Sequence, residues 1–328
     1  MKLLVTGGLG FIGSNFILQV LKNSSDFSVT NIDAELTGSD HHNLDELKNS
    51  PNYKFVKGNI TNKIMMEKLI ENHDCIINFA AESFVDRSIL DANQFLVSNI
   101  RGTYTILEVL RKHKKRLIQI STDEVFGSLK EGSAHETSRF NPSNPYAATK
   151  ASAELLVNSY VNTYDLDCVI TRCTNNYGPR QFYEKLIPKT IFLANQNKKI
   201  PIYGKGENIR DWIYVNDHCE AVLRVLLDGK KGESYNVSSD NEIDNLSIVK
   251  KILELLGKSS DLIEFVTDRP GHDLRYSLNS SKIKNSLKWN PKISFDDGIQ
   301  NTIDWLINNS GGKDISENIL GSTPWKKS

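Results

Sequence analysis

The glycine-rich stretch TGGLGFIGS at residues 6–14 constrains the fold of this chain more than any other feature of its sequence. It directly follows a short apolar run, residues 2–6, and it opens an amphipathic helical pattern. Glycines at this spacing permit a tight turn, let the main chain approach a pyrophosphate and allow close helix packing, while the helix N-terminus supplies amide donors. The stretch therefore predicts a dinucleotide-binding βαβ unit whose cofactor-binding residues are Gly7, Gly10, Phe11, Ile12 and Gly13.

Further strand-like runs alternate with longer helical patterns, at residues 28–33, 53–57, 74–79, 116–121 and 167–172. This alternation predicts an α/β fold, a Rossmann-type doubly wound parallel sheet, with ligands bound beyond the carboxyl ends of the strands. After Pro179 the regular alternation stops, which predicts a smaller α+β substrate-binding lobe. We expect the Rossmann domain at 1–177 with a return at 212–240, the lobe at 178–211 and 241–310, and a polar tail at 311–328.

The composition excludes several classes of protein. The 328 residues hold 40 Lys+Arg and 40 Asp+Glu, so the chain lacks the basic surface of a nucleic-acid binder. A hydrophobic content of 39% without any run of about 18 apolar residues argues against disorder and against a membrane partner. Residues 2–6 lead into the glycine turn instead of a cleavage site, so we expect no secretory signal and a cytoplasmic location. The four cysteines form no CxxC pair, and we expect reduced, structural thiols.

A carboxylate at the end of the second strand indicates which dinucleotide binds. Asp33 lies twenty residues after Gly13, where it can accept hydrogen bonds from both ribose hydroxyls and repel a 2′-phosphate. Between Asp33 and Leu47 there is no Arg or Lys, so the sequence favours NAD over NADP.

Residues after the third and fourth strands share the same edge of the sheet. Asn59 and Ile60 follow the third strand, and Ala80 and Ala81 follow the fourth. The Asn59 side chain can accept from the adenine amino group, or it can form an Asx turn at the next helix. The sequence leaves both interpretations open.

Tyr146 and Lys150 begin a helical pattern after Pro145, and their spacing of four places both side chains on one helix face. A nearby ammonium lowers the pKa of a phenol, so Tyr146 can act as a base, and the same lysine can hold the nicotinamide ribose. The alternative is an exposed helix pair. The preceding dinucleotide motif favours the catalytic interpretation.

Three polar residues, Thr122, Asp123 and Glu124, end the fifth strand, where a substrate would lie beside the nicotinamide. The Thr122 hydroxyl can share a hydrogen bond to the reacting sugar oxygen. Adjacent carboxyls facing an apolar pocket can titrate apart, one as an acid and the other as a base. Helix capping is the alternative for this Asp-Glu pair.

Seven motifs together resemble the extended short-chain dehydrogenase/reductase superfamily: TGGLGFIGS (6–14), FAAESFVDRS (79–88), STDEVFG (121–127), NPYAATKA (144–151), TRCTNNYGPRQFYEKLIP (171–188), PIYGKGENIRDWIYVNDH (201–218) and DRPGHDLRY (268–276). Within it they resemble nucleotide-sugar 4,6-dehydratases, most closely those acting on dTDP-glucose. The Thr-Asp-Glu motif is the specific element, because related epimerases usually lack the acid/base pair and related decarboxylases usually carry Ser-Glu.

The resemblance implies dehydration of dTDP-glucose to dTDP-4-keto-6-deoxyglucose with NAD as a regenerated cofactor. Tyr146 would be the base on the C4 hydroxyl, with Lys150 as its partner and Thr122 as hydrogen-bonding support. Asp123 would protonate the departing C6 hydroxyl, and Glu124 would remove the C5 proton.

The resemblance also implies how a nucleoside diphosphate hexose is held. Arg210 and Arg269 would bind the diphosphate, although surface salt bridges are the alternative for both. Asn99 matches a polar position of the superfamily's proton network and is assigned with the cofactor-binding residues, not with the substrate, with a buried helix cap as the alternative. The other predicted substrate-binding residues are Ser83, Asn175, Lys185, Leu186, Pro201, Tyr203 and His272, and we expect no metal site.

Two departures from the family's usual sequence and three alternative functions accompany this interpretation. Phe84 stands where the family usually has histidine, and residues 36–42 lack the family's usual loop sequence. Alternative functions are a UDP-hexose 4,6-dehydratase or a UDP-sugar 4-epimerase, and more remotely a non-catalytic NAD-binding regulator.

We also expect a homodimer through the helices at 93–112 and 146–164. Their apolar positions exceed what one sheet face can cover. Those positions are Val97, Ile100, Tyr104, Leu107, Leu155, Leu156 and Tyr160.

Overall fold

The computed structural model describes residues 1–309, so the tail predicted at 311–328 lies outside the described residues. Its central sheet has seven strands in the order β10-β6-β5-β4-β1-β2-β3, and every neighbouring pair is parallel. The strands are β1 (Lys2–Thr6), β2 (Ser28–Asp33), β3 (Tyr53–Lys57), β4 (Cys75–Asn78), β5 (Arg116–Thr122), β6 (Cys168–Cys173) and β10 (Ser234–Val237). The predicted fold class is confirmed.

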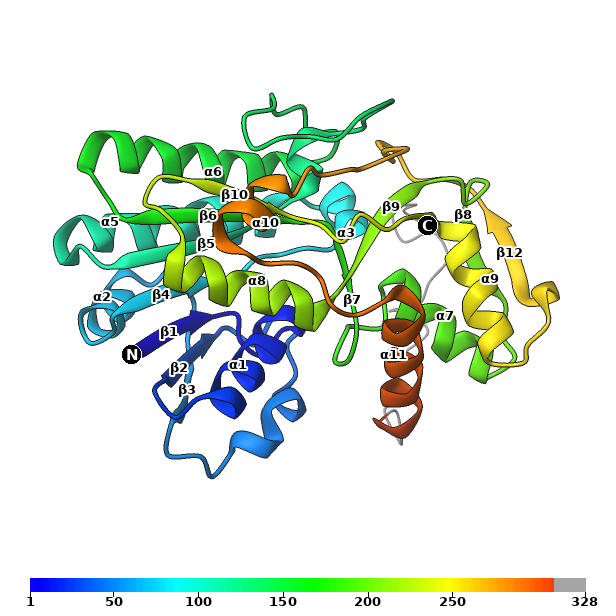
Figure 1. Cartoon of the computed structure of the whole chain (residues 1–328), viewed down its shortest axis with the longest axis horizontal. Helices are drawn as coiled ribbons and strands as arrows, with labels where there is room; N and C mark the ends of the chain where they lie inside the picture. The colour runs from blue at the N-terminus through cyan, green and yellow to red at the C-terminus, as the bar shows by residue number, and fades with distance from the viewer. Residues whose placement is uncertain (310–328) are drawn as a thin grey trace.

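Helices cover both faces of the central sheet (Figure 1). Side chains alternate along a strand, so Leu3 and Val5 of β1 pack on one side and Leu4 packs on the other. The first side is covered by α1 (Phe11–Asn23), α8 (Val215–Asp228) and α10 (Ser281–Leu287). The second is covered by α2 (Lys63–Glu71), α5 (Gly102–His113) and α6 (Pro145–Tyr164). Burial on both faces explains why the strands read as continuous apolar runs.

The smaller lobe contains two short sheets and three helices. Its strands are β7 (Asn175–Tyr177), β9 (Ile209–Tyr214) and β11 (Glu242–Asp244) in one sheet, and β8 (Ile200–Tyr203) and β12 (Ile263–Val266) in the other. Its helices are α7 (Leu186–Asn195), α9 (Asn245–Leu255) and α11 (Phe295–Asn309). Ile187, Ile248 and Ile299, one from each helix, pack together with Trp212 and Tyr214 of β9.

Shorter helical segments connect these elements. They are η1 (His41–Leu47), α3 (Val85–Leu90), α4 (Asn93–Phe95), the π-helical η2 (Leu96–Arg101), η3 (Asp123–Phe126) and η4 (Ser260–Leu262). Within residues 1–309, no helix has the length and apolar character needed to cross a lipid bilayer.

The chain returns to the central sheet twice after it has entered the smaller lobe. The first return brings α8 and β10, within the predicted segment 212–240. The second brings α10, whose Ile283 and Leu287 join Trp289 in the sheet's core, and Trp289 Nε1 donates to the Asp217 carbonyl over 3.1 Å. The predicted boundaries assigned this second stretch to the lobe. Its apolar residues pack instead against α8 and β10.

Candidate active site

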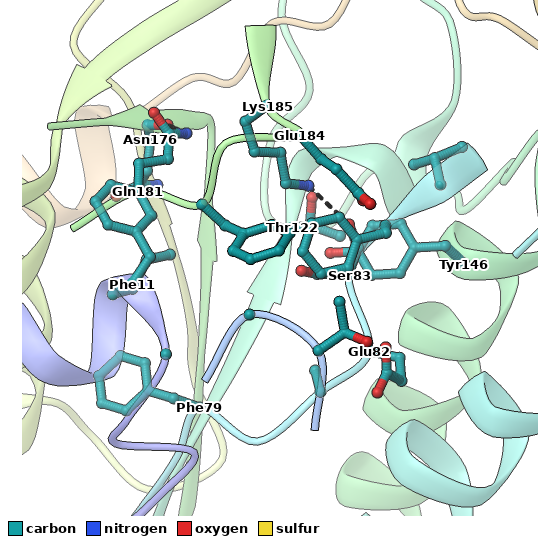
Figure 2. Close-up of a pocket in the computed structure, with 18 of the residues that line it drawn as sticks. Phe11, Phe79, Glu82, Ser83, Thr122, Tyr146, Asn176, Gln181, Glu184 and Lys185 are labelled. Carbon is teal, nitrogen blue, oxygen red and sulfur yellow. Dashed lines mark hydrogen bonds between the residues drawn. The ribbon is translucent and has the colours of Figure 1, made fainter. Parts of the chain in front are cut away.

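A cavity of about 440 Å³ lies where loops following the central strands meet the smaller lobe. The strand order reverses around β1, which has β2 on one side and β4 on the other, and such a reversal opens a crevice at the carboxyl ends. Figure 2 shows Phe11 and Phe79 toward one end of this cavity and Thr122, Tyr146 and Ser83 toward the other. The cavity is lined by every residue predicted for the site except Asp123 and Asn99.

The glycine turn after β1 leaves no room for side chains. A Cβ on Gly13 would lie 2.5 Å from the Gly7 carbonyl oxygen, and one on Gly7, whose φ is +69°, would lie 2.7 Å from Ala80 main-chain atoms. Helix α1 begins after Gly10 with no side-chain cap, so its first amides are available to an anion. These features fit a dinucleotide pyrophosphate.

Asp33 connects the glycine turn to the loop after β2. Its Oδ2 accepts from the Leu9 amide over 3.0 Å, and its Oδ1 accepts from the Glu35 amide and the Ser39 hydroxyl, both over 2.8 Å. A carboxylate has about four acceptor sites, so one stays open for a ribose hydroxyl. Lys57, at the end of β3, pairs with Glu35, which lowers the pKa of that carboxyl. The charge of Lys57 is therefore paired with Glu35, outside the cavity lining.

Two predicted cofactor residues use their side chains inside the protein. Asn59 Oδ1 accepts from the amide and the hydroxyl of Thr61, both over 2.9 Å, which is the Asx turn left open as an alternative. Asn99 Nδ2 donates to the Glu82 carbonyl and to Thr149, and its Oδ1 accepts from the Glu82 amide. Asn99 does not line the cavity, since its amide is engaged with Glu82 and Thr149, and its assignment to the cofactor site stays a prediction.

Helix α6 carries the Tyr-Lys pair and starts from a strong cap. Asn144 Oδ1 accepts from the Ala147 amide over 2.9 Å, and Pro145 occupies the first helical turn. Both Tyr146 and Lys150 are buried and line the cavity, so they are not an exposed helix pair. Lys150 Nζ donates to the Ile120 carbonyl over 2.7 Å, which ties α6 to β5.

The pKa values of this pair differ from the sequence-based expectation. Burial lowers the pKa of Lys150 to about 8. Burial, followed by the Glu124 carboxylate, raises the pKa of Tyr146 well above its ordinary value. We predicted a lowered phenol pKa, and the direction is opposite because burial and the Glu124 carboxylate both disfavour the phenolate.

The carboxyls after β5 have separate environments. The Thr122 hydroxyl donates to Asp123 Oδ1 over 3.1 Å, while Asp123 Oδ2 is buried with no hydrogen-bond partner among the described residues. Burial, followed by the charge of Glu124, raises the pKa of Asp123 to about 8. Asp123 is thus largely protonated at neutral pH, whereas Glu124 faces the cavity. Thr122, and not either carboxyl, caps η3 by accepting from the Glu124 amide.

The two predicted diphosphate arginines are both inside the cavity wall. Arg210 donates to the carbonyls of Ile209 over 2.7 Å and of Asp273 over 2.8 Å, and it stacks 4.3 Å from the Tyr276 ring centre. Arg269 pairs with Asp86 over 3.1 Å, and its Nε is buried with no partner among the described residues. Arg269 therefore retains an unused donor, whereas Arg210 mainly holds main-chain segments together.

Phe84 gives the substrate side of the cavity a cation-binding face. Lys185 Nζ donates to the Ser83 carbonyl over 2.9 Å, as Figure 2 shows, and lies 4.8 Å from the Phe84 ring centre. Burial lowers the pKa of Lys185. Phe84 also packs edge-on against Phe182 at 5.4 Å. The ring thus contacts Lys185 where a histidine would have offered a hydrogen bond.

His272 pairs with Asp268 over 2.6 Å, and burial lowers the pKa of His272 to about 4. Among residues 1–309, no group of three His, Cys, Asp or Glu side chains is arranged to hold a metal ion.

Several cavity residues were not predicted from the sequence, namely Glu82, Asp86, Gln181, Glu184, Lys189 and Tyr276. Glu184 accepts from Arg87 Nε over 3.1 Å, which joins α3 to the smaller lobe. Asn144 was also missed, and its signal was available, since Asn before Pro at a helix start marks an N-cap.

A parallel Rossmann sheet with a glycine turn, a Tyr-Lys pair and an acid pair at one cavity defines the extended short-chain dehydrogenase/reductase class. The model of the GDP-mannose 4,6 dehydratase family matches residues 4–302. This chain belongs to that family.

Similar proteins cover nearly the whole chain. Low-salt glycan biosynthesis protein Agl12 of Haloferax volcanii is 48% identical over 94% of this chain and 99% of its own length. A dTDP-glucose 4,6-dehydratase of Streptomyces niveus is 43% identical over 94% of each chain. The structure of a double mutant of DesIV, a dTDP-glucose 4,6-dehydratase of Streptomyces venezuelae with NAD bound, has a TM-score of 0.93 and 40% identity over 95% of this chain and 98% of that one.

Proposed function

We propose that this chain dehydrates dTDP-glucose to dTDP-4-keto-6-deoxyglucose with tightly held NAD. The observation that carries the proposal is a pair of adjacent carboxyls in different settings: Asp123 is buried behind the cavity lining with its pKa raised to about 8, whereas Glu124 lines the same cavity as Tyr146 and Lys150. A simple oxidation of an alcohol needs no second acid/base pair, whereas elimination of water needs an acid for the leaving hydroxyl and a base for the proton.

The residues that would hold NAD are those of the glycine turn, Asp33 and Lys150. The turn offers amides and close approach, Asp33 keeps one acceptor for the ribose, and Lys150 is buried beside Tyr146. NAD, when bound, supplies a reversible two-electron acceptor, so the net dehydration consumes no external oxidant.

The chain's own residues account for each proton that moves. Tyr146 reacts as its minor phenolate form, since its pKa is raised in the ligand-free site. It takes the proton from the C4 hydroxyl as that carbon becomes a ketone, and Thr122 hydrogen-bonds to the same oxygen. The ketone acidifies C5, whose proton Glu124 removes. Asp123 gives its proton to the C6 hydroxyl, which departs as water and leaves a C5–C6 double bond. The high pKa of Asp123 keeps that proton available at neutral pH. The hydride that bound NAD took from C4 would return to C6, and Glu124 would return the proton to C5, which gives the 4-keto-6-deoxy product.

The substrate's diphosphate would lie against the cationic side of the cavity. Arg269 has a free Nε for a phosphate oxygen and would exchange its contact with Asp86 for that ligand. Lys185 and His272 face the same space. The other predicted substrate contacts, Ser83, Asn175, Leu186, Pro201 and Tyr203, line the cavity around them.

We also propose a homodimer formed by η2, α5 and α6. Leu155 of α6 is 60% exposed, and Leu96 and Tyr104 on the neighbouring helices are about half exposed. Leu107, in contrast, is fully buried within the protomer, so it does not contribute to such an interface. The cytoplasmic location stays a prediction.

The test is to mix the purified protein separately with dTDP-glucose, UDP-glucose and GDP-mannose. We expect the alkaline ultraviolet absorbance of a 4-keto product, together with loss of one water by mass spectrometry, from dTDP-glucose. Turnover of UDP-glucose alone would contradict the assignment of thymine as the nucleotide base of the substrate. Formation of a C4 epimer without water loss would show an epimerase instead, and no reaction with any of the three would contradict the enzymatic assignment.

A further inference from the structure

Tyr276 lies between the carboxyl groups of Asp273 and of Glu124, the proposed base for the C5 proton. It belongs to the segment 268–278, which runs from β12 of the smaller lobe back toward α10 beside the central sheet (Figure 1). Its hydroxyl is 2.5 Å from Asp273 Oδ2 and 3.4 Å from Glu124 Oε2. The side chain is 2% exposed, so these two carboxyls are the main neighbours of its hydroxyl.

A tyrosine hydroxyl has one proton to donate, so it cannot serve both carboxyls at once. The shorter contact assigns the proton to Asp273, since charge-assisted hydrogen bonds are the short ones. Burial and the Glu124 carboxylate raise the pKa of Tyr276, so the hydroxyl keeps that proton. Its oxygen lone pair then faces Glu124 Oε2, whose one other hydrogen bond within residues 1–309 is a long contact of 3.3 Å from Asn144 Nδ2.

The contacts of Asp273 fix the direction of the hydrogen bond from the Tyr276 hydroxyl. Its Oδ1 accepts from the Ser143 hydroxyl over 2.5 Å, which leaves Oδ2 for Tyr276. Arg210 donates to the Asp273 main-chain carbonyl and stacks on the Tyr276 ring, so both residues are anchored to β9. Asp273 has no ion-pair partner in the described part of the chain, and its carboxylate is free to attract the tyrosine proton.

We infer that Asp273 and Tyr276 are positioning residues for the base: Asp273 withholds the Tyr276 proton from Glu124, which leaves the Glu124 carboxylate poorly hydrogen-bonded and reactive toward the C5 proton. The inference rests on the proposed function. When the C5–H bond breaks, its electron pair stays on the sugar, the proton joins Glu124, and Tyr276 keeps its own proton directed at Asp273. A donated hydrogen bond would instead stabilise the carboxylate before the reaction and slow it.

Asp273→Asn tests the direction of this hydrogen bond directly. Because Ser143 still donates to the remaining Oδ1, the new Nδ2 faces Tyr276 and donates to its oxygen, which turns the tyrosine proton toward Glu124. We expect C5 proton removal to slow by about tenfold or more, as for a hydrogen bond to a charged group. The KM for dTDP-glucose should change little, and the isotope effect from C5-deuterated substrate should rise.

The decisive measurement is a double-mutant cycle with Tyr276→Phe. Without the hydroxyl there is no proton to redirect, so Asp273→Asn should cost less than about threefold in the Tyr276→Phe background. A merely structural role for Asp273, through Ser143 and the 268–278 segment, would cost the same in both backgrounds and would overturn the inference. An unchanged C5 isotope effect in the single Asp273→Asn variant would overturn it as well.

Tyr235→Phe is the matched control, because Tyr235 is also buried and its hydroxyl only accepts from the Lys230 amide, away from the cavity. Asp273→Asn should cost as much in that background as in the wild type. A wild-type protein that forms no 4-keto product from dTDP-glucose would overturn the proposed function. Wild-type turnover with equal costs in every background would overturn only the inference about Asp273 and Tyr276.

Discussion

Lys150 Nζ donates a hydrogen bond to the carbonyl of Ile120, two residues before Thr122 on β5. This contact ties the helix that carries Tyr146 to the strand that ends at Thr122, directly before the acid/base pair. The reacting groups therefore belong to one rigid unit of α6 and β5, whereas the predicted substrate-binding groups Arg269 and Lys185 belong to the smaller lobe.

Tyr146→Phe should reduce kcat on dTDP-glucose by about 10² to 10⁴, because it removes the base for the C4 hydroxyl. The melting temperature should change little, since the ring and its packing against Phe95 stay. Steady-state kinetics with thermal unfolding of the same preparation measures both. A rate near that of the wild type would remove Tyr146 from this role.

Asp123 should make the stability of the ligand-free protein depend on pH. Its pKa is raised from 3.8 to about 8 in the folded state, so between about pH 4 and pH 8 the folded protein binds the extra proton. The stability that neutral Asp123 contributes is complete below pH 4 and is lost as pH rises through 8. Asp123→Asn cannot ionise, so its free energy of unfolding relative to wild type should increase from pH 4 to pH 8. Chemical denaturation that gives parallel pH curves for the two proteins would contradict the raised pKa.

The double variant Asp123→Asn/Glu124→Gln should oxidise the substrate and then stop. Tyr146 and Lys150 remain, but the groups for the C5 proton and the C6 hydroxyl are gone. Elimination should slow by about 10² or more for each group. Mass spectrometry should find a 4-keto hexose that keeps its C6 hydroxyl, and the near-ultraviolet absorbance of the reduced cofactor should persist. Unchanged dehydration would mean that the pair is structural, and no oxidation at all would place one carboxyl in the first step.

The purified protein should carry NAD without any being added. The cofactor would be held at the glycine turn, by Asp33 and by Lys150, and the net reaction never requires its release. Denaturing the protein and analysing the supernatant by chromatography gives the identity and amount of bound nucleotide. Recovery of NADP, or of no nicotinamide nucleotide, would contradict the assignment of Asp33.

Leu155→Arg should convert a dimer to a monomer at micromolar concentration, because it places an unpaired charge in the proposed apolar interface. Leu227→Arg is the matched control, since Leu227 is also exposed but lies on α8, across the sheet from α6. Light scattering after size exclusion measures the mass. A monomeric wild type would reject the dimer, and equal effects of both variants would show that the change is not specific to this face.

The sequence predicted the local elements of the Rossmann sheet closely. The first three strands have the predicted bounds and the next three differ by one residue at one or both ends, because β-branched runs closed by polar loops are a strong local signal. Residues reached by long-range packing were not predictable in the same way. Trp289 joins the sheet's core and Tyr276 reaches Glu124 from the other lobe, and neither relationship has a periodic signature in the sequence.

The site shows the same division. The sequence motifs predicted most of the residues that line the cavity. The pKa and the contacts of each side chain depend instead on its burial and its hydrogen-bond partners in the folded chain. Burial and Glu124 raise the pKa of Tyr146 where the Tyr-Lys spacing predicted a lowered one, and the Asn99 amide donates to Thr149 and not into the cavity. Spacing in the sequence predicts which side chains lie close together, whereas burial and hydrogen-bond partners determine their pKa values and therefore their charges.

The order of elements along the chain also affects its synthesis. Strand β10 pairs with β6 at the edge of the central sheet, yet about sixty residues of the smaller lobe and α8 separate the two. At roughly 5–20 residues per second, the ribosome takes about three to twelve seconds to add them. During that interval β6 is an unpaired strand edge of a nascent chain, which makes it the expected point of chaperone binding or of association between neighbouring chains.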